Sequence, residues 1–312
     1  MMLPTAQQTA LVTGGFGFLG RAVTTKLKRM GYRVVGIGHG RWGVQEALAH
    51  GFDVWLDAGV SLSSLATLDE RFDLVVHCAG SSSVGYSQTN PLQDFYKTVQ
   101  STADLLEYLR LNESQALLIY PSSAGVYGAT DDKPIKESDG LNPISPYGYH
   151  KKISEELLAS YSRNYGTRVA IVRFFSIYGE GLTKQLLWDA SIKLATATDA
   201  ATFWGTGEET RDWIHVTDAA ELITGLCESG AQFTVVNGAS GTRMTVNAVL
   251  EMLKEALGVD VQIKFNGSVR PGDPRFYHAD VSKLSGLGFA PTITLADGLK
   301  SYAAWFKTSW SR

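Results

Sequence analysis

Short apolar runs and longer amphipathic segments alternate along the first half of the chain. Six runs predict strands because they are rich in β-branched and aliphatic residues and end in glycine or polar residues: 9–15, 32–38, 52–57, 72–80, 116–123 and 168–175. Amphipathic stretches between them predict helices over 18–31, 94–111 and 145–165. Apolar strands alternating with helices are typical of an α/β fold, here a Rossmann-type doubly wound parallel sheet.

The alternation becomes irregular after about residue 180. A polar loop over 205–216 leads into a helix, a turn precedes an amphipathic helix within 238–258, and a long polar loop covers 265–280. The pattern predicts a nucleotide-binding domain over residues 1–172, with a return around 210–236. A smaller, irregular α+β lobe that holds the substrate is expected over 173–312.

The composition of the chain excludes several classes of binding partner. The 312 residues carry a formal net charge of -3, whereas nucleic acid or an anionic membrane would demand a basic face. No apolar run approaches a membrane span, and the first residues lack the features of a signal peptide, so a cytoplasmic protein is expected. Cys78 and Cys227 lie far apart in the sequence, which favours two free thiols in a reducing compartment over a disulfide framework. The six histidines show no metal-ligand spacing, so no metal site is expected.

A glycine series follows the first strand and opens the first helix. Gly14, Gly17 and Gly20 allow a tight turn and a close approach of the backbone to a pyrophosphate, which would lie at the positive end of the helix. This context predicts dinucleotide binding by the turn, including the intervening Phe16, Phe18 and Leu19.

The end of the second strand bears on the choice of dinucleotide. An acid that holds the adenosine ribose is usual there, but this chain has Gly38, followed by His39 and Arg41. A pocket for a ribose 2′-phosphate needs a cation and no carboxylate, so NADP(H) is favoured and NAD(H) remains possible. Asp57, at the end of the third strand, is expected to accept a hydrogen bond from the adenine amino group.

Several motifs together resemble one enzyme family. TGGFGFLG at 13–20, VVHCAGSSSVGYS at 75–87, PSSAGVYG at 121–128 and the pair Tyr147 and Lys151 are similar to the extended short-chain dehydrogenase/reductases. The nucleotide-sugar epimerase/dehydratase branch matches best, and its substrate-side motifs resemble residues 173–181, 205–220 and 270–284. The resemblance implies an enzyme with a nicotinamide cofactor, contacted in part by Ala79, and a nucleotide-activated sugar as substrate.

The resemblance also implies a proton-transfer device in the helix at 145–165. Tyr147 and Lys151 are four residues apart and therefore share a helix face. A neighbouring ammonium favours a phenolate over a phenol, and the lysine is also expected to hold the nicotinamide ribose. Ser123 corresponds to the catalytic serine or threonine that contacts the reacting sugar oxygen. Tyr149 and His150 do not share this geometry and are interpreted as structural.

Residues expected to hold the sugar nucleotide follow from the same resemblance. Arg211 and Arg270 would clamp the diphosphate, because guanidinium groups match phosphate oxygens. Asp273 would contact a ribose or orient Arg270, and the loop with Ser83, Val84 and Ser87 would line the sugar pocket. Two departures concern Ser176 and Thr98, since each stands where the family often has asparagine. The resemblance implies that position 176 contacts the substrate phosphate, for which serine is shorter, and that position 98 is structural and lies near the cofactor.

The resemblance leaves two reactions open. Dehydration is not expected, because Ala124 and Gly125 stand where the 4,6-dehydratases have the Asp-Glu pair that serves as acid and base. The reaction of the 3,5-epimerase-reductases is not expected either, because neither Cys78 nor Cys227 suits the proton exchange that it requires. NADPH-dependent reduction of a nucleotide 4-keto-sugar is favoured by Gly38, and 4-epimerisation with a tightly bound NAD is the alternative. A non-catalytic cofactor sensor is a remote third. Apolar stripes on the helices over 94–111 and 145–165 predict a homodimer.

Overall fold

The computed structural model describes residues 7–40, 42–228, 230–268 and 274–310. The chain divides into two compact units. The first comprises Met1–Val126, Pro143–Arg173 and Ala220–Val236, and the second comprises Tyr127–Asn142, Phe174–Ala219 and Asn237–Arg312. Residues 127–142, expected in the nucleotide-binding domain, thus belong to the second unit, while the roles of the two parts stay predictions.

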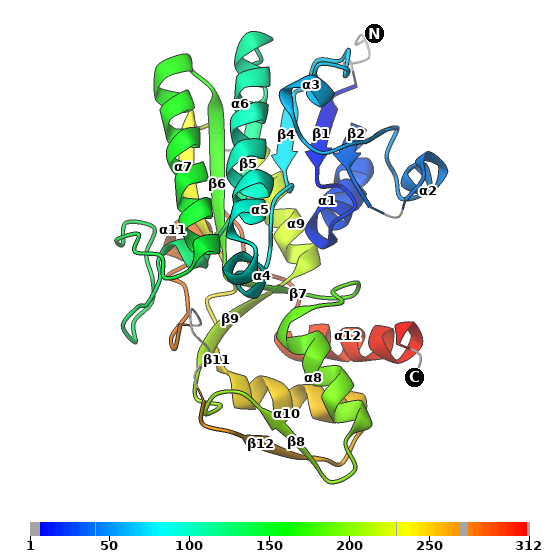
Figure 1. The fold of residues 1–312 in the computed structure, drawn as a ribbon, viewed down its shortest axis with the longest axis vertical. Helices are drawn as coiled ribbons and strands as arrows, with labels where there is room; N and C mark the ends of the chain where they lie inside the picture. Colours follow the sequence, from blue (N-terminus) through cyan, green and yellow to red (C-terminus); the bar gives the residue numbers. More distant parts are fainter. Residues whose placement is uncertain (1–6, 41, 229, 269–273, 311–312) are drawn as a thin grey trace. The chain divides into compact units, whose positions relative to one another are not determined.

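A parallel sheet organises the first unit. Within the described residues it contains seven strands in the order β10-β6-β5-β4-β1-β2-β3, so the chain winds outward from β1 in both directions (Figure 1). The strands are β1 (Thr9–Thr13), β2 (Arg33–Gly38), β3 (Val54–Asp57), β4 (Leu74–His77), β5 (Leu117–Ser123), β6 (Arg168–Phe174) and β10 (Phe233–Gly238). This order confirms the predicted Rossmann-type fold.

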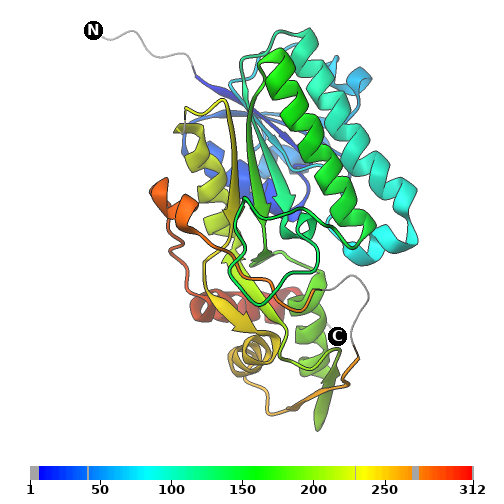
Figure 2. The same ribbon diagram turned by 90° about the vertical axis from the view of Figure 1, so that its left-hand side faces the viewer.

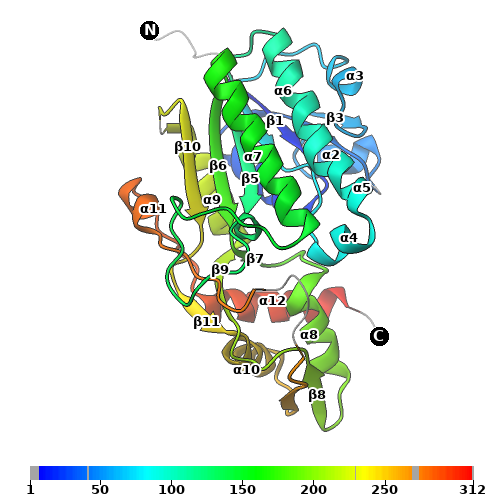
Figure 3. The same cartoon turned by 60° about the vertical axis from the view of Figure 1, so that its left-hand side comes forward.

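Helices cover both faces of the sheet, which explains why its strands are apolar on both sides. Figure 2 shows the sheet between two helical layers, and Figure 3 shows the layer formed by α5 (Pro91–Phe95), α6 (Ser101–Leu111) and α7 (Pro146–Tyr165). On the other face, α1 (Phe18–Arg29) packs against β1 and β2. The core joins strand and helix residues; it includes Leu11, Val35, Ile37, Val75, Leu105, Leu106, Leu118, Leu158 and Ile171.

The helix α7 forms where the sequence predicts it, and its ends have clear causes. Ser145 is the N-cap and its hydroxyl accepts the N–H of Gly148, while Pro146 occupies the first helical position, where no N–H is needed. Gly166 ends the helix with a left-handed φ of 72°, which glycine adopts without steric strain.

The structure differs from the sequence prediction in several segments. The single helix expected over 94–111 is α5, a π-helical turn (Tyr96–Gln100) and α6. Within that turn the hydroxyl of Thr98 accepts the N–H of Ser81. The helices α2 (Val44–Ala49), α3 (Leu62–Leu65) and α4 (Val84–Thr89) were not predicted, and neither were the helices over 185–196, 282–286 and 295–309.

The second unit contains two small sheets among its described residues. In one, β9 (Thr210–His215) pairs parallel with β7 (Ser176–Tyr178) and antiparallel with β11 (Arg243–Thr245); the other pairs β8 (Ala200–Phe203) with β12 (Gln262–Phe265). Its helices are α8 (Gln185–Thr196), α10 (Val246–Leu257), α11 (Ser282–Gly286) and α12 (Leu295–Ser309), and α9 (Val216–Gly225) follows β9 directly. The prediction of a loop over 205–216 is wrong for β9. Its buried Asp212 accepts hydrogen bonds from Ser240, Gly241 and Ala279, so a polar sequence here forms a strand.

Candidate active site

The glycine turn between β1 and α1 brings three chain segments close together. Gly14 has a φ of 63°, and its N–H donates to the carbonyl of Ile37 in β2 at 2.8 Å. A Cβ on Gly14 would lie 2.7 Å from the backbone nitrogen of Ala79, and one on Gly20 would lie 2.5 Å from the carbonyl oxygen of Gly14. The structure therefore places Ala79 against this turn, and only glycine fits at positions 14 and 20.

The start of α1 suits an anion. Its N-cap is Gly17, and within the described residues no side chain caps the helix and no acidic residue lies in its first turn, which includes Phe18, Leu19 and Gly20. The first N–H groups and the positive end of the helix dipole are therefore available to a negatively charged group. This turn fits the pyrophosphate of a dinucleotide.

The carboxyl ends of β2 and β3 lie side by side, with Gly38 paired to Asp57. A Cβ on Gly38 would lie 3.1 Å from the Trp55 ring, and Cβ atoms on Gly15 and Gly36 would meet the rings of Phe52 and Trp55 at 3.0 Å or less. Packing against the Trp55 ring thus offers an explanation for the glycine at position 38 other than a phosphate pocket. His39 and Asp57 are exposed, Phe16 is half-buried, and Arg41 lies outside the described residues.

Tyr147 and Ser123 meet at Gly125. Tyr147 is the second residue of α7, and Ser123 is the last residue of β5. From the position of a Cβ on Gly125, the Tyr147 ring lies 3.5 Å away and the Ser123 hydroxyl oxygen 3.3 Å away. The Ser123 hydroxyl also accepts the N–H of Gly125 at 3.1 Å, which fixes its direction. The edge of the Tyr147 ring and the Ser123 hydroxyl therefore flank one glycine, an arrangement that fits a pair of groups acting on one substrate oxygen.

Lys151 follows one turn after Tyr147 on α7. Its side chain is 5% exposed, its ammonium donates to the carbonyl of Pro121 at 2.9 Å, and it lies 4.5 Å from the centre of the Tyr120 ring. The hydroxyl of the neighbouring Ser122 donates to Glu155, further along α7, at 2.5 Å. Ser122 is therefore engaged by a different part of α7 than the part next to Ser123.

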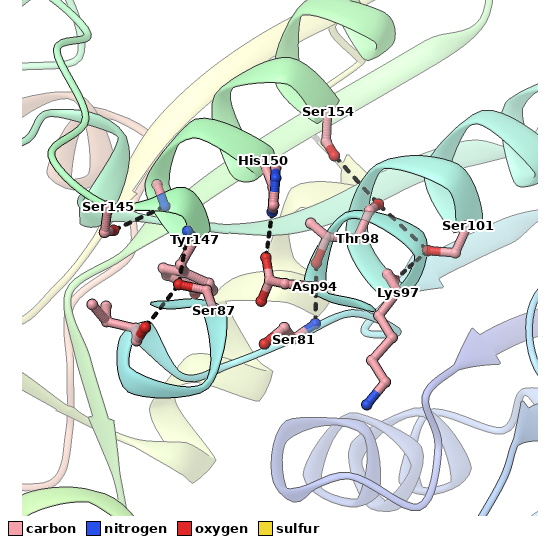
Figure 4. Close-up of polar contacts among 12 residues, drawn as sticks. Ser81, Ser87, Asp94, Lys97, Thr98, Ser101, Ser145, Tyr147, His150 and Ser154 are labelled. Atoms are coloured by element: carbon pink, nitrogen blue, oxygen red, sulfur yellow. Dashed lines mark hydrogen bonds and ion pairs between the residues drawn. The ribbon is translucent and has the colours of Figure 1, made fainter. Parts of the chain in front are cut away.

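The segment after β4, which was expected to be a loop that lines the sugar pocket, contains the short helix α4. Ser83 is the N-cap of α4, where its hydroxyl accepts the N–H of Tyr86, and Val84 is half-buried. Ser87 is fully buried, and its hydroxyl donates to the carbonyl of Val84 and accepts the N–H of Tyr147 (Figure 4). The expectation that Ser87 lines a sugar pocket is therefore wrong, because its polar atom is used within the chain.

A series of buried hydrogen bonds through His77, near Lys151, was not predicted from the sequence. The N–H of Ala79 donates to Thr13, and the Thr13 hydroxyl lies 2.7 Å from Nδ1 of His77, whose Nε2 lies 3.1 Å from the Thr102 hydroxyl. Burial, with a smaller effect of the Lys151 ammonium, lowers the pKa of His77 to about 3. His77 is therefore neutral. The available sequence signal was a histidine at the end of an apolar strand.

Cys78 is not suited to proton exchange. Desolvation raises the pKa of its thiol to about 12, against a smaller opposing effect of the Lys151 ammonium. The thiol therefore stays protonated near neutral pH.

The second unit holds the remaining substrate candidates that the structure describes. Ser176 in β7 pairs with Trp213 in β9, and Arg211 lies two residues before Trp213, so strand alternation places Ser176 and Arg211 on one face. Arg211 is half-buried and lies 5.9 Å from the Tyr277 ring centre. Arg270 and Asp273 lie outside the described residues.

Two kinds of feature are absent from the described part of the chain. No helix there is long and apolar enough to cross a membrane, and no group of three or more histidine, cysteine or acidic side chains there could hold a metal ion.

Comparisons with known proteins agree over almost the whole chain. The model of the NAD dependent epimerase/dehydratase family matches residues 10–238. A protein of Methanocaldococcus jannaschii, named as a putative UDP-glucose 4-epimerase, is 28% identical over 311 residues, which cover 96% of this chain and 98% of that protein.

Solved structures give the same result. The UDP-glucose 4-epimerase of Thermotoga maritima with UDP-glucose has a TM-score of 0.89 and 27% identity, covering 97% of this chain and 99% of that one. The UDP-glucuronic acid 4-epimerase of Bacillus cereus, in complex with UDP-glucuronic acid and NAD, has a TM-score of 0.86 and 26% identity, covering 97% and 100%.

Proposed function

The chain belongs to the NAD dependent epimerase/dehydratase family, and we propose that it is a UDP-sugar 4-epimerase that works with NAD. The family membership and the enzyme class confirm the resemblance identified in the sequence. The observation that carries the proposal is the meeting of Tyr147 and Ser123 at Gly125, with Lys151 one turn further on α7. The relatives favour epimerisation over the reduction that the sequence analysis preferred.

The first unit contributes the residues that handle the proton. Tyr147 takes the proton from the sugar hydroxyl at C4 and later returns it, and the Ser123 hydroxyl holds the same oxygen. The Lys151 ammonium, one turn further along α7, is fixed by the Pro121 carbonyl, and it would hold the nicotinamide ribose. The chemistry supplied by bound NAD is reversible hydride transfer at that carbon.

NAD, rather than NADP, is the cofactor we propose. Gly14, Gly17, Gly20 and the start of α1 would hold its pyrophosphate, and Ala79, beside Gly14, would contact it. The preference for NADP rested on Gly38, and the packing of Trp55 offers another reason for that glycine. A relative with 26% identity binds NAD.

The second unit would hold the nucleotide diphosphate. Arg211 supplies a guanidinium group, and Ser176 on the adjacent strand supplies a hydroxyl from the same face. Arg270 and Asp273 remain proposed members of this site from the sequence motif alone.

We also propose a homodimer through the helical face formed by α5, α6 and α7. Part of the predicted stripes is core, since Val99, Leu106 and Leu158 are buried. Large apolar side chains nevertheless remain exposed on these helices and on the π-helical turn between α5 and α6; they are Leu92, Tyr96, Leu111, Tyr149 and Tyr165. Sedimentation of the wild type and of Leu92→Glu tests the proposal. We expect the wild type to be a dimer and the charge in Leu92→Glu to weaken its association. A wild type that is a monomer at all concentrations would contradict the proposal.

The reaction is tested with purified protein and a panel of UDP-sugars, each incubated with and without NADPH. We expect interconversion of C4 epimers without added NADPH, and its abolition in Tyr147→Phe. Tyr149→Phe is the matched control, because it removes the same hydroxyl from an exposed position two residues further along α7. Net consumption of NADPH with a 4-keto-sugar, and no epimer formation, would favour the reductase instead.

A further inference from the structure

The backbone at Tyr147 is held by a residue far away in the sequence. At the start of α7, Pro146 has no N–H, the N–H of Gly148 donates to the Ser145 hydroxyl at 3.2 Å, and that of Tyr149 donates to the Ser145 carbonyl. The N–H of Tyr147 donates instead to the hydroxyl of Ser87 at 3.0 Å. Ser87, in α4, therefore completes the set of acceptors that the first turn of α7 requires.

The Ser87 hydroxyl has a defined orientation. Ser87 is 0% exposed, and its O–H donates to the carbonyl of Val84 at 2.7 Å within the same helix. Because the proton points toward Val84, a lone pair remains directed at the N–H of Tyr147. Burial excludes water as a replacement acceptor, so loss of the hydroxyl leaves the N–H unsatisfied.

A second contact joins the next helix to the same turn. Asp94 of α5 is 0% exposed, and its carboxylate lies 2.5 Å from Nδ1 of His150 in α7 (Figure 4). The segment Val84–Phe95 thus contacts α7 at Tyr147 and again at His150, the residue before Lys151. Both ends of the Tyr147–Lys151 turn are held by α4 and α5.

We propose that Ser87 is a positioning residue for Tyr147: it fixes the backbone of the tyrosine, and so the place of its phenol beside Ser123, without touching substrate. This inference rests on the proposed epimerase function. A displacement of about 1 Å at a reacting group lowers the rate far more than it lowers binding, because proton transfer depends steeply on distance.

The test compares Ser87→Ala with Thr245→Ala. Thr245 is the matched control, since its hydroxyl accepts the N–H of Ala248 at 3.2 Å at the start of α10 in the second unit. We expect kcat of Ser87→Ala to fall about tenfold to a hundredfold, with KM and the Kd for NAD within about twofold of wild type. Thr245→Ala is expected to lose a similar amount of stability and to keep its kcat.

Hydrogen exchange gives a readout that needs no substrate. The amide of Tyr147 is expected to exchange faster in Ser87→Ala than in wild type, and to be unchanged in Thr245→Ala. If Ser87→Ala does not fold, Ser87→Cys serves, because it keeps a side chain of similar size with a much weaker acceptor.

Each outcome decides one of the two proposals. A wild type that converts no UDP-sugar refutes the epimerase, while the exchange of the Tyr147 amide still tests the contact with Ser87. An active wild type together with a Ser87 variant of unchanged kcat, or unchanged exchange at Tyr147, refutes the positioning role.

Discussion

Two glycines with nearly the same φ angle allow the steric demand of the nucleotide turn to be measured. Gly14 has a φ of 63° and Gly258, which ends α10, has a φ of 66°. A Cβ on Gly14 would lie 2.7 Å from backbone atoms of Cys78 and Ala79, whereas a Cβ on Gly258 would have no described atom within 4 Å. Replacing each by alanine therefore imposes the same strain in φ and different contacts.

The expected magnitudes separate these two effects. An alanine in the left-handed region costs about 1–2 kcal/mol, so Gly258→Ala should lose that amount of unfolding free energy. Gly14→Ala loses it too, and overpacking against backbone that cannot rotate away adds about 1–3 kcal/mol. In Gly14→Ala the added Cβ should push the end of β4 away from the turn, and this displacement should also weaken NAD binding. In Gly258→Ala we expect NAD binding to be unchanged.

The two units require separate measurements of stability, because one unfolding midpoint need not report both. Native-state amide exchange in β4 reports the change at Gly14, exchange in α10 reports the change at Gly258, and calorimetry gives the affinity for NAD. Equal losses of stability in the two variants, with normal NAD binding by Gly14→Ala, would refute the argument that Ala79 packs directly against the turn.

Three further predictions use other parts of the molecule. The pKa of His77 is lowered to about 3 in the folded protein, against about 6.5 in an unfolded chain. As the pH falls below about 6.5, the unfolded state therefore binds a proton that the folded state does not bind. The free energy of unfolding should decrease by about 2 kcal/mol between pH 7.5 and pH 5. Urea unfolding should show this loss in wild type and a smaller one in His77→Gln, and equal losses would contradict it. His150→Ala leaves buried Asp94 unpaired and should cost about 3–5 kcal/mol, measured by amide exchange in α7, against less than about 0.5 for the exposed Lys300→Ala, measured by amide exchange in α12; equal effects would count against the pair. Arg211→Ala should weaken calorimetric binding of a UDP-sugar by about 1.5–3 kcal/mol and leave NAD binding intact, and the reverse would reassign the arginine.

The sheet was predictable because its strands have a simple physical cause. Runs such as LLIYPSS at Leu117–Ser123 are apolar on both faces, and such a run has few stable places other than a covered parallel sheet. The strand β9 was not predictable by that criterion. Its sequence places Arg211 and Asp212 in the strand, and Asp212 is stable there only because Ser240 and Ala279, remote in the sequence, donate to it.

The candidate site shows the same division. The spacing of Tyr147 and Lys151 is a property of one helix, so a sequence contains it, and the structure places both on α7. Ser87 and Asp94 act through contacts with α7 that depend on how α4 and α5 pack, and no local pattern contains that information. The π-helical turn contains Thr98, whose hydroxyl accepts the N–H of Ser81 from another segment, and no local pattern in the sequence indicates this turn.

The end of β2 shows how one residue type can mislead. A glycine there fits either a bulky phosphate or a bulky side chain, and Trp55, on the neighbouring strand, fills the space above Gly38. Since Gly38 pairs with Asp57, the carboxylate at this edge of the sheet belongs to β3. Asp57 was expected at the adenine amino group; we propose instead that it lies near the adenosine ribose, where it would repel a 2′-phosphate. We therefore expect Asp57→Asn to shift the ratio of the Kd values for NADP and NAD by about tenfold toward NADP, equivalent to about 1.4 kcal/mol. Asp104→Asn, a carboxylate change on α6, should leave the ratio unchanged. Calorimetric titration with both cofactors measures it, and an unchanged ratio in Asp57→Asn would mean that another residue excludes the phosphate.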